Sequence, residues 1–233
     1  MATNKRNLFQ DHLWIWALLA IGFIARIVGI NFGLPNLYHA DEPIIVNHAV
    51  AYGTGDLNPH FFKIPPLVSY LLFCIYGFYF VLGQLFSQFG SMNDFADLFL
   101  TDPTSFYLLG RVVFGAFLGT LTVYVLYRLV KKFFSAEHAL LSAFFLSVAF
   151  LHVRDAHYVY VDIPLVLMLV LCFFPIFQIL NQGNQKNYII FGFLAGVAIA
   201  VKYNGIFIFA PLLLAHFLKH GFRSSSILIL NFV

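Results

Sequence analysis

The sequence predicts an all-α, polytopic integral membrane protein, and three observations support this fold class. The 233 residues are 61% hydrophobic, whereas soluble domains are about 45–50% apolar. Only 10% of the residues are charged, and the mean hydropathy is +0.86. Apolar runs close to the ~20 residues that cross a bilayer recur along the chain, which favours helices over the short alternating strands of a barrel. The net charge of +3 gives no indication of a nucleic-acid partner.

The first span is predicted over residues 13–32. Lys5 and Arg6 precede it, so the positive-inside rule places the amino terminus in the cytoplasm. A cleaved signal peptide is the alternative. The run is longer than the apolar core of a typical signal peptide and contains Arg26, which favours an uncleaved helix.

We expect residues 33–105 to form the first outer loop, carrying two helices that lie at the membrane surface. Asp41 and Pro43 suit the start of a short helix, whose apolar face continues to Tyr52. A second apolar stretch, residues 65–86, opens on two prolines.

Whether residues 65–86 cross the membrane decides the rest of the topology. If they cross, Arg128, Lys131 and Lys132 face the outside. If they lie along the outer surface, or dip in and return, those three residues and the later basic clusters all face the cytoplasm. The positive-inside rule favours this second arrangement. About six spans are then predicted, the later five at 106–127, 137–153, 163–180, 188–203 and 206–218.

The last residues, 227–233, open a fresh apolar run. We therefore expect the visible residues 1–233 to be the amino-terminal part of one larger membrane module. Further spans and an outer domain would follow.

This topology gathers ionisable residues at the outer face of a chain that has few of them. A charge at the bilayer centre costs about 2.5–3.5 kcal/mol, and less near the interface, so such residues are usually paired, face a cavity or carry a function. The outer-face set is Asp41, Glu42, Lys63, Arg111, Arg154, Asp155, Asp162 and Lys202.

The adjacent carboxylates Asp41 and Glu42 are the predicted catalytic residues. Neighbouring carboxylates repel one another, whereas the amino end of a helix favours their ionised forms. A carboxylate balanced in this way can act as a general base toward a hydroxyl or an amine. A helix cap beside a solvated charge is the simpler alternative.

Four further residues are candidates for substrate binding. Lys63 precedes a proline-started helix, where it can meet a lipid phosphate, and Lys202 lies on the side where positive charge is disfavoured. For both lysines, the alternative is a side chain that reaches to lipid head groups. Arg154 is a second possible head-group anchor, and Asp162 a possible cap of the next helix.

Several histidines also fall on the outer side, namely His39, His48, His60, His152 and His157. None has the spacing of a HExxH-type zinc site, so the sequence predicts no metal centre and no cofactor. A requirement for a divalent cation stays open.

The candidate residues lie in short motifs that follow one another in a set order. They are Ala40-Asp41-Glu42, Pro65-Pro66-Leu67, Arg111 near the start of a span, Arg154…Asp162-Ile163-Pro164-Leu165, and Gly196…Lys202-Tyr203-Asn204-Gly205. With this order the chain resembles the amino-terminal half of a GT-C glycosyltransferase. It is most similar to the protein O-mannosyltransferases and the bacterial aminoarabinose (lipid A) transferases, whose first outer loop also carries two membrane-lying helices.

The resemblance implies an enzyme that moves a mannose-like or other sugar from a polyprenyl-phosphate carrier to a protein, lipid or glycan acceptor. Transfer would occur at the outer or lumenal face, with inversion at the anomeric carbon. The membrane would be the plasma or inner membrane, or the endoplasmic reticulum membrane in a eukaryote. The chain departs from the pattern at Ile64, where many mannosyltransferases have histidine before the two prolines, which weakens an assignment to the protein-acceptor branch.

The resemblance also implies residue roles. Asp41 would activate the acceptor, with Glu42 in support. Lys63 and Lys202 would face the donor phosphate, and the remaining two candidates, Arg154 and Asp162, would belong to the same active side.

Two other classes of function remain open. A transporter would need charged residues deep in several spans. Here only Arg26 lies within an apolar run, and it is nearer the outer end of that run. A membrane assembly partner without chemistry is the second.

Overall fold

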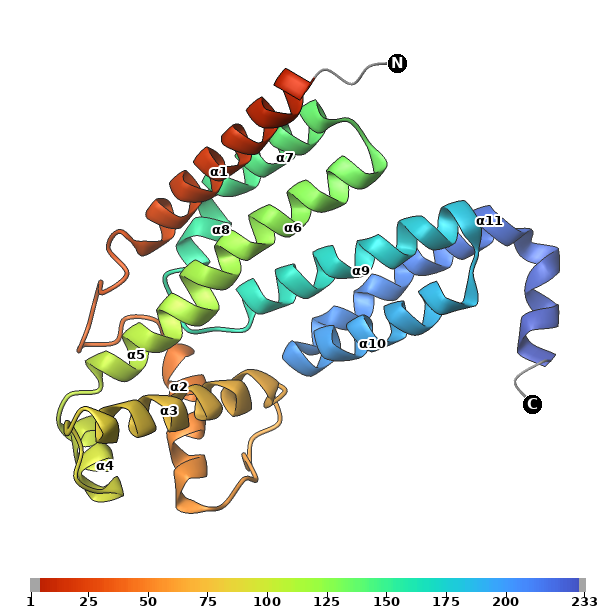
Figure 1. Ribbon diagram of the computed structural model, residues 1–233. Coiled ribbons are helices and arrows are strands. Elements are labelled where there is room, and N and C mark those ends of the chain that lie inside the picture. The colour runs from red at the N-terminus through yellow and green to blue at the C-terminus, as the bar shows by residue number, and fades with distance from the viewer. Residues whose placement is uncertain (1–4, 231–233) are drawn as a thin grey trace.

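Every regular element in residues 5–230, the part of the chain that the computed structural model describes, is a helix (Figure 1). The predicted all-α fold class is therefore confirmed. The helices form two long groups that meet at one end, where residues 33–105, the predicted first outer loop, pack beneath them (Figure 1).

The first group contains α1 (Lys5–Ile27), α6 (Leu118–Phe133) and α7 (Ala136–Val148), which lie side by side (Figure 1). Small and aromatic side chains fill their contact: Ile15, Val123, Tyr127, Ala139 and Ala143 are all buried. Apolar side chains on the remaining faces stay exposed, as expected of helices that face lipid.

The helix α6 continues backwards through a π-helical segment, Arg111–Phe117, into α5 (Thr104–Gly110). A π-helical turn is rare and is often found at functional sites. Within it, a Cβ atom on Gly115 would lie 1.9 Å from the carbonyl oxygen of Ala156. Only glycine therefore lets the segment after α8 (Phe150–Asp155) approach this helix so closely.

The second group contains α9 (Asp162–Gln182), α10 (Gln185–Val201) and α11 (Phe209–Leu230), which is bent at Gly221. A short 3-10 helix, Tyr203–Ile208, joins the last two. Their shared core is formed by Cys172, Ile176, Phe191, Ala195, Ile208 and Ala215.

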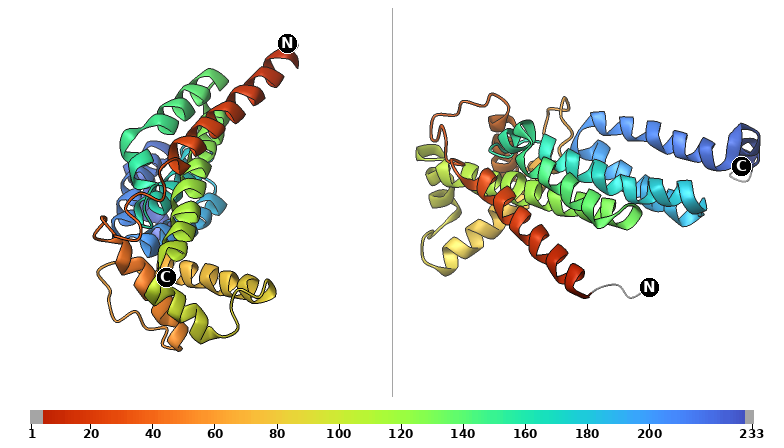
Figure 2. Two further views of the ribbon diagram at one scale, coloured as in Figure 1. Left: turned by 90° about the vertical axis from the view of Figure 1, so that its left-hand side faces the viewer. Right: turned by 90° about the horizontal axis from the view of Figure 1, so that it is seen from above.

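Three helices of the segment predicted as the first outer loop gather beside α5: α2 (Glu42–Ala51), α3 (Leu67–Leu85) and α4 (Met92–Thr101). In the further views, α3 runs at an angle to α6 and leaves the bundle on one side (Figure 2). The sequence analysis expected two helices here and did not foresee α4. That helix starts with a capping box. The hydroxyl of Ser91 accepts the backbone N–H of Asp94, and the carboxylate of Asp94 accepts the backbone N–H of Ser91.

Three helical stretches are long and apolar enough to cross a membrane by length and composition: Leu67–Leu85, Thr104–Phe133 and Asp162–Gln182. The helices over Leu13–Ile27, Ala136–Val148 and Gln185–Val201 are apolar but shorter. The chain is thus a multi-helix membrane protein. Because α3 meets the criteria for a span, the expectation that residues 65–86 do not cross stays a prediction.

The predicted span at 137–153 is wrong in one respect, because the helix breaks at Ala149 and divides into α7 and α8. The buried Arg26 lies at this break. Its guanidinium donates to the carbonyl oxygens of Ser147 (3.0 Å) and Leu146 (3.0 Å), and to Nδ1 of His152 (2.9 Å). The last carbonyls of a helix have no partner within it, so this arginine caps α7. Arg26, the charged residue within a predicted span that was weighed as a sign of a transporter, thus has a structural role.

The helix ends that carry the outer-face candidates lie together, at the end of the bundle nearest α2 and α5 (Figures 1 and 2). The ends that carry Lys131, Lys132 and Lys186 lie at the opposite end. This separation agrees with one cytoplasmic and one outer face, although which face is which stays a prediction.

Candidate active site

Tyr160 is the residue around which three of the predicted site residues converge. Lys202 Nζ lies 2.5 Å from Asp162 Oδ1 and 5.5 Å from the centre of the Tyr160 ring. Burial raises the pKa of Tyr160 to about 12, and the negative charges of the nearby Asp41 and Asp162 contribute to this rise. Asp41, Asp162 and Lys202 therefore share one small region.

The local sequence explains why Lys202 and Asp162 meet. Asp162 opens α9, with Pro164 in the first turn, where proline is tolerated. Lys202 follows α10 in an extended conformation, and a tight 3-10 turn comes next. A Cβ on Gly205 would lie 2.6 Å from the backbone of Ala198, so this turn requires glycine. The capping alternative for Asp162 is not observed, since Val161 occupies the cap position.

Asp41 stands immediately before α2, but its carboxylate makes no capping hydrogen bond. The capping alternative is therefore not observed, and the side chain is half-buried. The backbone N–H of Asp41 donates to His39 Nδ1 (3.3 Å). The His39 ring in turn lies 4.4 Å from the Tyr158 ring and 5.7 Å from the Tyr160 ring, measured between centroids.

Glu42 points the other way and is fully buried. Its two carboxylate oxygens accept bonds from Arg111 Nε (2.8 Å) and Nη2 (2.6 Å), and Oε1 also accepts the N–H of Val159 (2.8 Å). Arg111 Nη1 donates to the carbonyls of Ile30 (2.8 Å) and Phe32 (2.9 Å). This buried clamp joins the end of α1, the start of α2, the π-helical segment and the segment before α9. Glu42 is thus enclosed by its partners, and its predicted catalytic role stays a prediction.

Lys63 is exposed, in the loop before α3, and the described part of the chain offers it no ion-pair partner. The neighbouring residue Phe62 accepts a hydrogen bond at its carbonyl from the hydroxyl of Tyr203 (3.0 Å). Tyr203 directly follows Lys202, so this bond fastens the Lys63 loop beside the second predicted cation.

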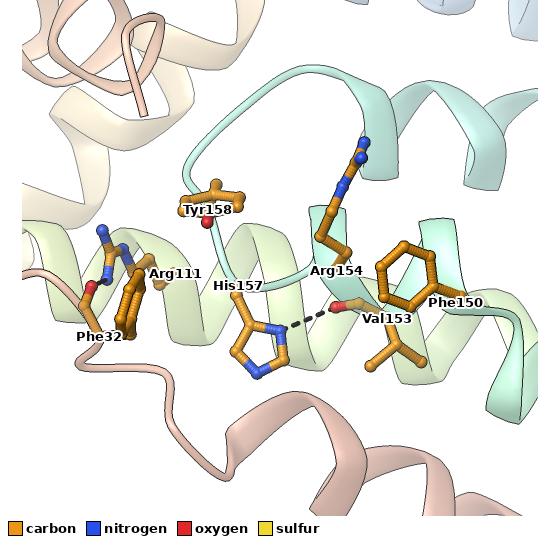
Figure 3. A pocket seen from close by; sticks show the side chains of 7 residues that line it. All are labelled: Phe32, Arg111, Phe150, Val153, Arg154, His157 and Tyr158. Carbon is orange, nitrogen blue, oxygen red and sulfur yellow. Dashed lines mark hydrogen bonds between the residues drawn. The ribbon is translucent and has the colours of Figure 1, made fainter. Parts of the chain in front are cut away.

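Arg154 does not join the Tyr160 cluster. It lies on α8, and its guanidinium binds the Asp155 carboxylate at 2.8 and 2.7 Å. It also lines an open pocket of about 290 Å³, named here the α8 pocket (Figure 3). The pocket is lined by Phe32, Arg111, Phe150, Val153, Arg154, His157 and Tyr158.

Sequence reasoning missed the residues that connect these groups. Tyr158 and Tyr160 alternate with Val159 just before Asp162, and this alternation was the available signal. Arg111 was placed at the outer face, but its pairing with a residue 69 positions away was not foreseen. Within the described residues, no three side chains of His, Cys, Asp or Glu come together in a way that could hold a metal ion.

A family profile described as dolichyl-phosphate-mannose-protein mannosyltransferase matches residues 104–230, which is more than half of the chain. The match starts at α5 and includes Arg111, Tyr160, Asp162 and Lys202, whereas Asp41 lies before it. No curated protein sequence and no solved structure matches the chain.

Proposed function

Because the chain belongs to the dolichyl-phosphate-mannose-protein mannosyltransferase family, and so to the GT-C glycosyltransferases, we propose that it transfers a sugar from a polyprenyl-phosphate donor. The general class of the enzyme, a membrane glycosyltransferase of the mannosyltransferase kind, follows from the family. The donor, the outer or lumenal site and the role of Asp41 as the acceptor-activating carboxylate are our proposal.

The reaction asks two things of the protein. The acceptor must lose a proton, and the departing phosphate must be stabilised, because displacement at an anomeric carbon passes through an oxocarbenium-like state. In the proposed step, Asp41 takes the proton from the acceptor hydroxyl or amine while that atom bonds to the anomeric carbon. The bond from this carbon to the phosphate oxygen breaks, and its electron pair leaves with the phosphate. A single displacement of this kind inverts the anomeric configuration.

Lys202, beside Tyr160, and Lys63, in a loop bonded to the next residue Tyr203, are suited to the leaving phosphate. Lys202 is oriented by Asp162 at 2.5 Å and by the Tyr160 ring, which favours a positive charge near its face. Lys63 is exposed in a loop fastened beside it. Lysine presents a compact charge with three donors, which suits a phosphate that changes its charge during the reaction.

Tyr160 and the buried clamp support Asp41 without touching the substrate. With a pKa of about 12, Tyr160 keeps its proton at physiological pH, so its hydroxyl can donate a hydrogen bond to the nearby Asp41 carboxylate. Glu42 fixes the start of α2 through Arg111, so we assign it a positioning role. The observation that carries the proposal is the approach of Asp41 and Lys202 to one tyrosine from distant segments.

The test uses the full-length protein in nanodiscs with radiolabelled polyprenyl-phosphate-mannose. Asp41→Asn should reduce transfer at least 100-fold, because the general base is lost, while donor binding changes less than twofold. Lys202→Ala should weaken donor binding at least tenfold. Asp97→Asn, which removes an exposed carboxylate on α4, is the matched control and should behave as the unmodified protein. Transfer that survives in Asp41→Asn would contradict the catalytic assignment.

A further inference from the structure

A second group of cations lies on the last turns of α6, at the end of the bundle opposite the candidate active site (Figure 1). Arg128 and Lys132 are four residues apart, so they are neighbours on one face of the helix, and both are exposed. Among the residues that the structure describes, no carboxylate lies within ion-pair distance of either side chain. Two like charges at this spacing repel one another. An anion that binds between them would therefore neutralise a charge that the described residues leave uncompensated.

Aromatic rings fix the positions of both cations. The guanidinium of Arg128 lies 5.7 Å from the centre of the Tyr124 ring, and its Nη1 donates to the Tyr124 hydroxyl (2.7 Å). Lys132 Nζ lies 5.4 Å from the centre of the Phe133 ring and 5.8 Å from that of Phe174, on α9. The face of an aromatic ring attracts a positive charge. The two side chains are thus ordered before a ligand arrives, which lowers the entropic cost of binding.

Next to the cations, the same face of α6 is apolar. Leu121 and Val125 precede Arg128 at helical spacing and are half-buried. Phe134, directly after α6, is 58% exposed. The predicted span at 106–127 ends just before Arg128, which places the cations at the boundary between lipid and water. The surface therefore fits an amphipathic anion, with its charge at the cations and its apolar part along the helix.

We propose that Arg128 and Lys132 bind the phosphate of an anionic phospholipid, in the leaflet predicted to face the cytoplasm. That leaflet carries anionic lipids, which attract basic residues beside a span. The lipid is a structural ligand and not a substrate, because the candidate active site lies at the other end of the bundle. Since Lys132 contacts Phe174, the bound lipid also stabilises the junction between α6 of the first helix group and α9 of the second. This site does not depend on the proposed function.

The first experiment measures lipid binding by native mass spectrometry of the full-length protein released from detergent micelles. Dioleoyl-phosphatidylglycerol and dioleoyl-phosphatidylcholine are added separately. The unmodified protein should bind the anionic lipid at least about tenfold more tightly than the neutral one. The double variant Arg128→Gln/Lys132→Gln should lose this preference, while its affinity for phosphatidylcholine changes less than about twofold.

Three control variants separate a defined site from a general charge effect. Lys186→Gln/Lys219→Gln removes the same number of charges from the same end of the bundle, where Lys186 opens α10 and Lys219 bonds to the end of α9. It should keep the preference for the anionic lipid. Lys202→Ala, in the candidate active site, should keep it too. Phe174→Leu retains both charges but removes a ring beside Lys132, and should weaken binding of the anionic lipid about threefold.

Four results would overturn the inference. The first is equal affinity of the unmodified protein for the two lipids. The second is an equal loss in the two double variants, which would show a general attraction to the basic end of the bundle. The third is loss of the preference in Lys202→Ala, which would place the lipid in the candidate active site. The fourth is displacement of the lipid by millimolar sn-glycerol 3-phosphate, which would assign the cations to a soluble phosphate.

A second measurement reports on the junction of α6 and α9 and uses a milder change. The full-length protein and its Lys132→Gln variant are unfolded by heat in nanodiscs of phosphatidylcholine, with and without phosphatidylglycerol. The anionic lipid should raise the midpoint temperature of the unmodified protein, because it binds the folded state, and should raise that of Lys132→Gln clearly less. Lys186→Gln should respond as the unmodified protein does. Equal stabilisation of Lys132→Gln and the unmodified protein would contradict the proposed site.

Discussion

Breaking the buried clamp between Glu42 and Arg111 should destabilise the fold far more than breaking an exposed ion pair of the same chain. Both side chains of the clamp are at most 1% exposed, and two hydrogen bonds of 2.6 and 2.8 Å join them. Removing one partner of a buried pair leaves an uncompensated charge, at a cost of about 3–5 kcal/mol. We therefore expect Glu42→Met and Arg111→Met each to lower the free energy of unfolding by about that amount.

The double variant should cost clearly less than the sum of the two single variants, because it leaves no lone charge in the interior. Three backbone groups, on Ile30, Phe32 and Val159, still lose their partners in the double variant, and the bonds of Ile30 and Val159 are buried. Some destabilisation therefore remains, since each unpaired group costs about 1–3 kcal/mol. We expect a coupling free energy of about 2–3 kcal/mol, toward the upper end of the range for residues in contact.

The assay is reversible unfolding in mixed micelles, followed by circular dichroism at 222 nm. Arg154 and Asp155 supply the internal control, because their pair has side chains 52% and 30% exposed. The cycle of Arg154→Gln and Asp155→Asn should give a coupling below about 1 kcal/mol. The reasoning is refuted if the Glu42–Arg111 cycle is additive, or if either single variant costs less than the control variants.

Three further predictions concern the surroundings of Asp41. Asp41→Asn should lower the pKa of Tyr160 from about 12, because the negative charge that opposes phenolate formation is removed. A difference titration at 295 nm, with Tyr160→Phe as the reference, measures this pKa. An unchanged pKa would mean that Asp41 does not face the ring. The same raised pKa makes the folded state lose stability as the pH rises from 10 toward 12, and Tyr160→Phe should lack this loss. His39→Ala should lower kcat without changing donor affinity, since the acceptor for the Asp41 N–H is lost. His39→Asn should restore kcat, because its Oδ1 can take the place of Nδ1, and a failure of this rescue would argue against the positioning role.

Hydropathy predicted most of the helices. The observed helix ends differ from the predicted ones where contacts with other helices intervene. The predicted stretch at 163–180 became α9, with one residue more at its start and two more at its far end, because both limits are encoded locally, by Pro164 in the first turn and by Gly183 in the left-handed conformation. The break at Ala149 could not be predicted, since alanine favours helices and the break is stabilised by Arg26 from another helix. The helix α4 was within reach, because Ser91 and Asp94 have the spacing of a capping box.

Part of the site followed from topology. Once the basic clusters were assigned to one face, Asp41, Asp162 and Lys202 had to lie at the other, and in the structure they meet at Tyr160. The partner of Glu42 was beyond this reasoning, because a pairing across 69 positions leaves no trace in a hydrophobic period. Arg154 shared the face but not the cluster, since a face defines only a layer and not a position within it.

The adjacent carboxylates of Asp41 and Glu42 have different surroundings because helix geometry turns neighbouring side chains in different directions. At 3.6 residues per turn, successive side chains at the start of a helix point about 100° apart, so Asp41 and Glu42 cannot face the same cavity. Glu42 points inward, where only a full set of partners makes a buried charge tolerable, and Arg111 with Val159 provides that set. That requirement fixes the rotation of α2, and the rotation leaves the half-buried Asp41 beside Tyr160. The orientation of the proposed base is thus determined by the burial of its neighbour, which is why a change at Glu42 should affect both stability and turnover.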